Sequence, residues 1–174
     1  MDTSFDMFHE TEVPEGELII SRTDLRGIIT YVNETFAHIS GYDADELIGK
    51  PHSILRHPDM PKAAFAELWK TIEAGKTWEG YVKNLRKDKG FYWVLARVSP
   101  VVKNGEVVAY KSLRAHVPKP KRIEMQNTYD QMRMDAGEPV RIVAYLDNAD
   151  YRRLAEEAEN RGISPDALLH EKLK

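Results

Sequence analysis

One stretch, residues 50–94, constrains the fold of this chain more than any other. It contains all three tryptophans of the protein together with Phe91 and Tyr92. Polar side chains are interleaved with these rings, namely Arg56, His57, Asp59 and Asn84. A hydrophobic core needs few such groups, whereas a pocket for a planar ligand needs flat apolar walls and a few oriented donors and acceptors. The stretch therefore predicts a pocket for a planar ligand with polar edges.

The composition excludes several classes of function. The chain has 174 residues, 42% of them hydrophobic, which is enough for one well-buried domain and a small appendage. It has no cysteine, which excludes disulfides, thiolate catalysis, iron–sulfur clusters, zinc–thiolate sites and photochemistry through a flavin–cysteine adduct. The net charge of −3 does not favour nucleic acid or an anionic membrane. No apolar run approaches the roughly 20 residues that cross a bilayer, so we expect a soluble, cytoplasmic protein.

Residue patterns between 18 and 117 predict an α+β domain. β-branched and aromatic runs bounded by turn residues indicate strands at 18–21, 28–32, 78–85, 91–101 and 106–115. Capping residues and apolar spacing indicate helices at 34–39, 43–48 and 61–75. The order of these elements predicts a five-stranded antiparallel sheet with helices on one face.

Two further segments follow the α+β domain. Pro118 and Pro120 interrupt the pattern, and residues 122–136 then form an expected linker helix with an apolar stripe of Met125, Tyr129 and Met132. Such a narrow stripe fits a helix that pairs with a partner or packs on the domain surface. Beyond it, one strand and two helices are too few to bury a core alone, which predicts a homodimer. The expected segments are 1–17 (extension), 18–117 (domain), 118–137 (linker) and 138–174 (C-terminal module).

Residues 18–117 resemble a PAS sensor domain. The motifs that carry the resemblance are Asn33-Glu-Thr-Phe36, Ser40-Gly-Tyr42, Glu46-Leu-Ile-Gly49, Trp78-Glu-Gly80 and the turn from Asn84 to Lys89. The longer string from Arg56 to Ala66, with Trp69 and Val82-Lys-Asn84, is similar to the PAS domain of bacterial aerotaxis receptors, which carries FAD noncovalently. The Asn84 turn is also similar to that of the FAD-bearing sensor that controls nitrogen fixation. Aerotaxis receptors continue into membrane and signalling segments that we do not find here, so chemotaxis itself is not implied.

The resemblance implies a cofactor, FAD, held between the helices and the sheet. The Asn84 amide matches the alternating C=O and N–H groups of the flavin pyrimidine edge. Arg56 and His57 would hold phosphate or ribose, with Asp59 orienting them. Trp69 would contact adenine or isoalloxazine, and Trp78 would face the pocket. The expected cofactor-binding residues are Asn33, Arg56, His57, Asp59, Trp69, Trp78 and Asn84.

Structural roles for the same residues stay open alternatives. Asn84 is also compatible with a surface position at a strand end, and Asn33 is explained as the N-cap of a helix. The group around Arg56 and His57 is compatible with a polar cluster that fixes a loop. A third possibility is His57 as a haem ligand, since haem-bearing PAS domains exist. Trp93 is expected in the core.

Residues 138–174 resemble a ribbon-helix-helix module. The resemblance rests on Arg141-Ile-Val-Ala-Tyr-Leu146, the helix through Leu154, and Arg161-Gly-Ile-Ser164. It implies a homodimer that reads DNA through Arg141, Val143 and Tyr145, with Ser164 at a phosphate. Only one of the three reading residues is basic, and the segment has more acidic than basic side chains. Dimerisation without DNA binding therefore stays an alternative.

These features together predict a cytoplasmic FAD-binding redox or oxygen sensor that signals through its C-terminal module as a transcriptional regulator. The sequence shows no constellation of catalytic acid, base or nucleophile, so turnover of a small-molecule substrate is not expected. The alternatives are a dimeric PAS interaction protein without DNA binding, a haem-binding PAS sensor, and an enzyme that uses the flavin as a hydride carrier.

Overall fold

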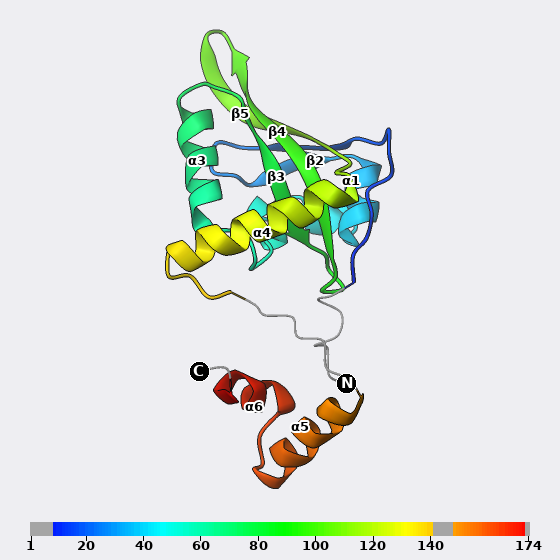
Figure 1. The fold of residues 1–174 in the computed structure, drawn as a ribbon. Coiled ribbons are helices and arrows are strands. Elements are labelled where there is room, and N and C mark those ends of the chain that lie inside the picture. Colours follow the sequence, from blue (N-terminus) through cyan, green and yellow to red (C-terminus); the bar gives the residue numbers. More distant parts are fainter. Residues whose placement is uncertain (1–8, 141–147, 173–174) are drawn as a thin grey trace. The chain divides into compact units, whose positions relative to one another are not determined.

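The computed structural model describes residues 9–140 and 148–172 (Figure 1). The chain divides into two compact units at the boundary between Val140 and Arg141. The first unit contains a sheet and the helices packed on it, and the second contains two helices. No helix in the described ranges is long and apolar enough to span a membrane.

The first unit is built around a five-stranded antiparallel sheet, as the sequence predicts. The strand order is β2-β1-β5-β4-β3. The strands are β1 (Ile19–Thr23), β2 (Ile29–Val32), β3 (Trp78–Leu85), β4 (Phe91–Lys103) and β5 (Glu106–Ala115). The last three form a meander, and β5 then pairs with β1 so that the first hairpin joins the same sheet.

Short helices connect β2 to β3. They are α1 (Glu34–Ser40), α2 (Ala44–Leu47), the 3-10 helix η2 (His52–Leu55) and α3 (Lys62–Glu73). Asn33 caps α1, since its side-chain oxygen accepts a hydrogen bond from the Phe36 amide at 3.1 Å. Gly41 ends α1 in the left-handed conformation that glycine adopts without steric cost. This connection places α3 against β3 and β4.

Successive side chains of a strand point to opposite sides, so the sheet has two faces. Different helices cover these two faces. On the inner face, which we define by Val82, Asn84 and Ala96, lie the connecting helices. On the outer face, which we define by Lys83 and Trp93, lies α4 (Lys119–Asp135), which crosses the sheet (Figure 1). The ring of Tyr129 on α4 stacks on Trp93 with a centroid distance of 6.2 Å. Trp93 is thus in the core, as expected.

Helix α4 packs on the domain surface, one of the two arrangements that the sequence allows for the linker. It starts at Lys119, before the expected position, because Pro120 lies in the first turn, where the missing amide hydrogen costs no hydrogen bond. The expected contact stripe is wrong in part. Tyr129 is buried, but Met132 is exposed and two arginines, Arg122 and Arg133, are buried instead.

The described part of the N-terminal extension lies in an extended conformation beside the start of β4. The Thr11 amide donates to the Phe91 carbonyl, and the Phe91 amide donates to the carbonyl of His9, both at 2.8 Å. Arg122 of α4 donates to the carboxylates of Glu10 and Glu12 at 2.9 and 3.0 Å. Helix α4 therefore holds this segment on the domain.

The second unit contains the two helices that the sequence predicts, α5 (Asn148–Asn160) and α6 (Pro165–Lys172). Gly162 separates them, and Ser164 caps α6 by accepting a hydrogen bond from the Ala167 amide at 3.2 Å. Ala158 and Leu168 are fully buried between the helices. The expected strand at 140–146, with Arg141, Val143 and Tyr145, lies outside the described residues apart from its first position.

Candidate functional site

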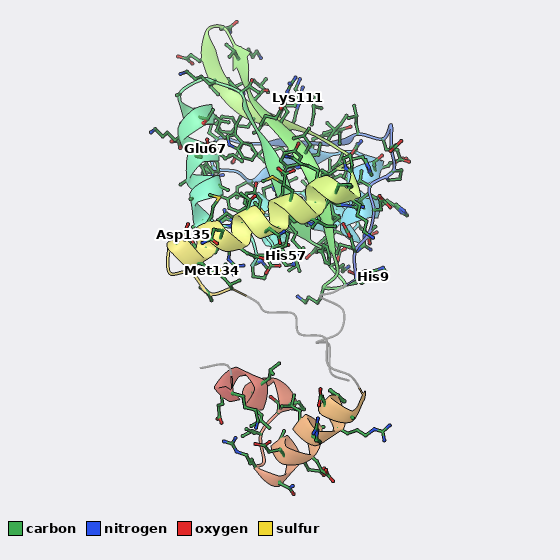
Figure 2. All side chains as sticks on the ribbon, viewed as in Figure 1. His9, His57, Glu67, Lys111, Met134 and Asp135 are labelled. Carbon is green, nitrogen blue, oxygen red and sulfur yellow. The ribbon has the colours of Figure 1, made fainter. Side chains whose placement is uncertain are left out.

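A cavity of about 370 Å³ lies between α3, η2 and the inner face of the sheet. Figure 2 labels Glu67 on α3 and Lys111 on β5, the two elements between which the cavity extends. The residues lining it are Ser21, Thr23, Arg26, Gly27, Pro51, His52, Ser53, Arg56, Phe65, Leu68, Trp69, Ile72, Trp78, Val82, Asn84, Ala96, Val98, Tyr110, Lys111, Ser112 and Arg114. Such a volume suits a small ligand or the ring system of a larger one.

The walls of the cavity are apolar and partly aromatic. Phe65, Leu68, Trp69 and Ile72 recur at helical spacing, so α3 presents all four on the face that lines the cavity. The Trp69 ring meets Tyr110 of β5 edge-to-face, with centroids 5.9 Å apart. These side chains supply the flat surfaces that a planar ligand needs.

Trp78 owes its orientation to a glycine. A Cβ at Gly80 would lie 2.4 Å from the Trp78 ring, so only glycine at position 80 lets the indole lie over the strand. The indole nitrogen donates to Glu67 of α3 at 3.4 Å, and the residue is buried. The ring therefore forms part of the cavity wall.

Polar side chains gather on the strands that line the cavity. The buried Asn84 of β3 and Ser112 of β5 each have a polar atom, Nδ2 and Oγ respectively, without a hydrogen-bond partner among the described residues. A buried polar group left without a partner costs about 1–3 kcal/mol. Groups of this kind at a cavity wall are suited to a ligand that supplies the missing acceptor and donor.

Arg114 brings a buried positive charge to the same cavity. Its guanidinium donates to Ser21 Oγ at 3.1 Å and to His52 Nε2 at 2.7 Å, and neither partner is a carboxylate. None of the described residues that line the cavity is acidic. Burial lowers the pKa of Arg114 to about 10, so the group stays protonated at neutral pH. The field inside the cavity therefore favours a ligand with negative charge or electron-rich edges.

His52 is neutral in this arrangement. Burial, and then the nearby Arg114 charge, lower the pKa of His52 to about 3. His52 is one of the residues that line the cavity. The neutral ring can accept the hydrogen bond from Arg114 at Nε2, which a protonated ring cannot do.

Comparison with known proteins assigns the fold of this site-bearing unit. Residues 29–114 match the sequence profile of the family described as PAS fold. This segment contains β2, β3 and β4 in full, most of β5, and all the helices that line the cavity. Residues 29–114 form a PAS domain.

Two curated relatives of the PAS domain are signalling or regulatory proteins by name. The aerotaxis receptor of Escherichia coli (strain K12) is 47% identical over 104 residues, which are 60% of this chain and 21% of the receptor. The nitrogen fixation regulatory protein of Klebsiella pneumoniae is 30% identical over 108 residues, 62% of this chain and 22% of that protein. The chain therefore spans about a fifth of the length of these relatives.

Solved structures share the PAS fold. The light-state structure of the blue-light photoreceptor Aureochrome1 LOV superposes with a TM-score of 0.58 at 22% identity, over 63% of this chain and 89% of that one. The PAS domain of a protein from Colwellia psychrerythraea superposes with a TM-score of 0.54 at 25% identity, over 59% and 87%.

Four of the seven expected cofactor-binding residues line the cavity of the PAS domain. They are Arg56, Trp69, Trp78 and Asn84. Arg56 places its guanidinium 3.9 Å from the centre of the Phe65 ring. The backbone of Arg56 forms an isolated antiparallel bridge with Asn84, which brings the irregular segment after η2 to the edge of β3.

The structure places the other three expected residues, Asn33, His57 and Asp59, outside the lining of this cavity. The Asn33 side chain forms hydrogen bonds with the backbone: it accepts from the Ile20 and Phe36 amides and donates to the Leu18 carbonyl. His57 is fully buried, and its Nδ1 accepts from the Asp59 amide at 3.1 Å. Asp59 pairs with Lys83 on the outer face. The structure gives no support to His57 as a haem ligand in this cavity.

Arg114, His52 and Ser112 line the cavity but were not predicted from the sequence. A signal for two of them was available, since Tyr110, Ser112 and Arg114 alternate along β5 and must share one face. An arginine is rarely buried on the inner side of a strand unless a polar partner or ligand pairs with it. His52 carried no such signal because it lies on a single-turn 3-10 helix.

We expect the low pKa of His52 to make the PAS domain less stable in acid. Below about pH 6.5 the unfolded chain takes up a proton on this ring that the folded protein resists, so stability falls as the pH decreases towards 3. The loss approaches about 1.4 kcal/mol per pH unit for one such group. Urea denaturation at pH 7 and pH 5 measures it. His52→Gln should reduce the difference between the two pH values, and the exposed His38→Gln should leave it unchanged.

Proposed function

We propose that the PAS domain binds a flavin in the cavity between α3 and the inner face, and that it acts as a redox or oxygen sensor. The observation that carries the proposal is the buried Asn84 amide, whose Nδ2 lacks a partner among the described residues at the wall of a cavity lined by Trp69 and Trp78. An amide offers one donor and one acceptor side by side, which matches the polar edge of the flavin pyrimidine ring.

The relatives support this assignment. The aerotaxis receptor and the nitrogen fixation regulatory protein carry signalling and regulatory names, and a LOV domain studied with a flavin analogue superposes with a TM-score of 0.56. The resemblance of the string from Arg56 to Ala66 to aerotaxis receptors points to FAD among the flavins. In the proposal, the cationic Arg26, Arg56 and Lys111 on the cavity lining bind the phosphate-bearing tail of such a cofactor.

A bound flavin would supply reversible uptake of electrons and protons. The residues that line the cavity would then have distinct roles. Asn84 hydrogen-bonds the polar edge and can turn over its amide when donor and acceptor needs reverse. Arg114 offsets negative charge that reduction adds to the cavity, and His52 holds the Arg114 guanidinium in place. Trp69 and Trp78 keep water from the apolar part of the ring.

Spectroscopy of the purified protein tests the proposed function. We expect the two visible bands of an oxidised flavin, which dithionite bleaches and air restores. Heat release followed by chromatography against FAD and FMN standards identifies the cofactor, and we expect FAD. A protein that stays colourless after incubation with an excess of either flavin contradicts the proposal, and a Soret band supports the haem alternative instead.

We expect Arg114→Met to lower the midpoint potential of the bound flavin. The buried guanidinium stabilises the electron-rich reduced ring more than the oxidised ring, so its removal makes reduction harder. A spectroelectrochemical titration of both proteins measures the shift. Arg97→Met removes the same charge from an exposed position on the outer face and should leave the potential close to that of the wild type. An unchanged potential in Arg114→Met would show that Arg114 does not face the ring.

We further propose that the C-terminal unit is a dimeric output module of this sensor. Its two helices bury few side chains completely, Ala158 and Leu168 among those described, and Leu154 and Leu169 stay partly accessible. A unit of this size gains stability from a second copy. Light scattering of the full chain tests dimerisation, and gel shift with genomic fragments in both redox states tests DNA binding. A monomer at all concentrations contradicts the first proposal, and absence of salt-sensitive binding contradicts the second.

A further inference from the structure

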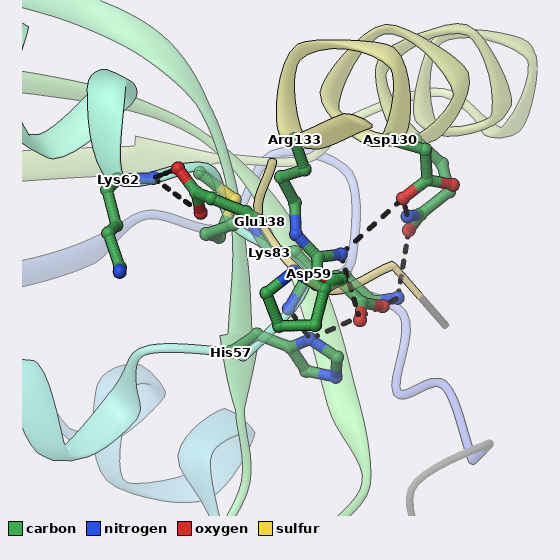
Figure 3. A network of polar contacts seen from close by, with 10 residues as sticks. His57, Asp59, Lys62, Lys83, Asp130, Arg133 and Glu138 are labelled. Atoms are coloured by element: carbon green, nitrogen blue, oxygen red, sulfur yellow. Dashed lines mark hydrogen bonds and ion pairs between the residues drawn. The ribbon is translucent and has the colours of Figure 1, made fainter. Parts of the chain in front are cut away.

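A buried cluster of charges lies on the outer side of β3, away from the cavity (Figure 3). Asp59 is at its centre, 2.8 Å from Lys83 Nζ, 3.6 Å from Arg133 Nη1 and 3.5 Å from His57 Nδ1. The side chains of Asp59, Lys83 and Arg133 are each less than a tenth exposed. Charges buried to this extent are costly unless they are paired, so their relative positions are tightly constrained.

The cluster is joined to the wall of the cavity through the backbone. Lys83 directly precedes Asn84 in β3, so the two side chains point to opposite faces of the same strand. Arg56 pairs its backbone with Asn84, and three residues later the chain reaches Asp59 on the other side of β3. The segment 56–59 therefore wraps around the edge of β3, with one end at the cavity and the other in the charge cluster.

The same cluster is joined to helix α4. Arg133 of α4 faces Asp59, and Gln126 of α4 accepts a hydrogen bond from Lys83 Nζ at 2.9 Å. Just beyond α4, the Glu138 carboxylate accepts from the Lys62 amide at 3.4 Å, which is at the start of α3 (Figure 3). Helix α4 thus contacts Asp59 and Lys83 beside β3, and Glu138 just beyond it contacts the first turn of the helix that carries Trp69.

We propose that Asp59 and Arg133 are positioning residues that couple flavin binding in the cavity to the attachment of α4 on the outer face. Both events favour one arrangement of β3 and the segment 56–59, so each strengthens the other, and the coupling is reciprocal by thermodynamic necessity. This inference rests on the proposed flavin site. It makes α4, which precedes the second unit in the chain, the element that senses whether the cavity is filled.

Amide hydrogen exchange and flavin titration of the full chain test the coupling. In the wild type, saturating flavin should slow exchange in the last two turns of α4 by about fivefold or more, the usual lower range of allosteric coupling. Arg133→Gln removes the charge that faces Asp59, so it should weaken flavin binding by a comparable factor and make α4 exchange insensitive to flavin. Arg133→Lys retains a charge and should recover part of both effects.

Two controls separate coupling from loss of structure. Lys119→Gln removes a positive charge from an exposed position on the same helix and should behave like the wild type in both measurements. Exchange of sheet amides in Arg133→Gln should stay slow, which shows that the fold is intact.

The outcomes distinguish this inference from the proposed function. A wild-type chain that binds no flavin contradicts the proposed function itself. Normal flavin binding with unchanged exchange in α4, or with an unchanged affinity in Arg133→Gln, overturns the coupling alone. Weaker binding in Arg133→Gln without any effect of flavin on α4 in the wild type also overturns it, since Arg133 would then act only on stability.

Discussion

Ala96→Phe is expected to abolish flavin binding and to leave the PAS fold intact. Ala96 is 2% exposed, lies on β4 and lines the cavity, so a phenyl ring at this position occupies the space that the flavin would take. We expect the cavity of about 370 Å³ to hold the added ring, so that the strands stay in place. Titration of the flavin-free protein with FAD should show at least about a hundredfold weaker binding, equivalent to about 2.7 kcal/mol.

The matched control for this variant is Ala109→Phe. Ala109 lies on β5, and its position in the strand directs the side chain to the outer face. The same added volume there should leave flavin affinity within about twofold of the wild type, because surface substitutions usually change a free energy by less than about 0.5 kcal/mol. Circular dichroism of both variants checks the fold. Retained flavin binding in Ala96→Phe would mean that the cofactor site lies elsewhere.

Asp59→Ala is expected to destabilise the first unit by about 3–5 kcal/mol, because it leaves Lys83 and Arg133 as buried charges that have lost a common counter-ion. Marginally stable domains lose a large part of their stability in this way. Guanidinium denaturation followed by circular dichroism measures the free energy of unfolding, and flavin affinity should fall with it.

A second substitution identifies the cause of this loss. Lys83→Met in the Asp59→Ala background replaces one of the two buried charges that faced Asp59 with an apolar chain of similar length, and should recover part of the lost stability. Glu79→Gln, which breaks an exposed ion pair with Arg97 on the same pair of strands, should cost less than about 1 kcal/mol. A cost below about 1 kcal/mol for Asp59→Ala would show that the cluster does not hold the segment in place.

The sequence was sufficient for the order of the elements because short-range patterns determine them. Asn33, Asp43 and the Asn104–Gly105 turn fix the starts of helices and a hairpin through local hydrogen bonds and backbone conformation. These capping and turn residues mark where the strands begin and end, and the observed antiparallel sheet has the five predicted strands. Asn84 lies at the cavity because it is two residues after Val82 in β3, and alternate residues of a strand share one face.

The position of His57 and Asp59 was beyond the reach of sequence reasoning. Both are within three residues of Arg56, which lines the cavity, and proximity in sequence led to one expected site for all three. The segment lies outside any regular strand or helix, so no period of two or 3.6 residues reports which way each side chain points. The chain bends around β3 there, and the partners that fix the bend come from residues 83 and 133.

The contact face of α4 was mispredicted for a related reason. An apolar stripe is the usual signal of a packed helix face, and Met132 fitted it by spacing. Two arginines are buried instead of Met132, because carboxylates that are distant in sequence lie opposite them: Glu10 and Glu12 for Arg122, and Asp59 for Arg133. Helical periodicity within one segment does not contain this information.

A crystal structure of the coloured, purified protein tests the central claim most directly. We expect the tricyclic ring of the flavin inside the cavity, against Trp69, with the Asn84 amide hydrogen-bonded to its polar edge and Arg114 beside it. A ring bound at another place in the chain, or a cavity closed by its own side chains with Asn84 bonded to the protein, would contradict the account.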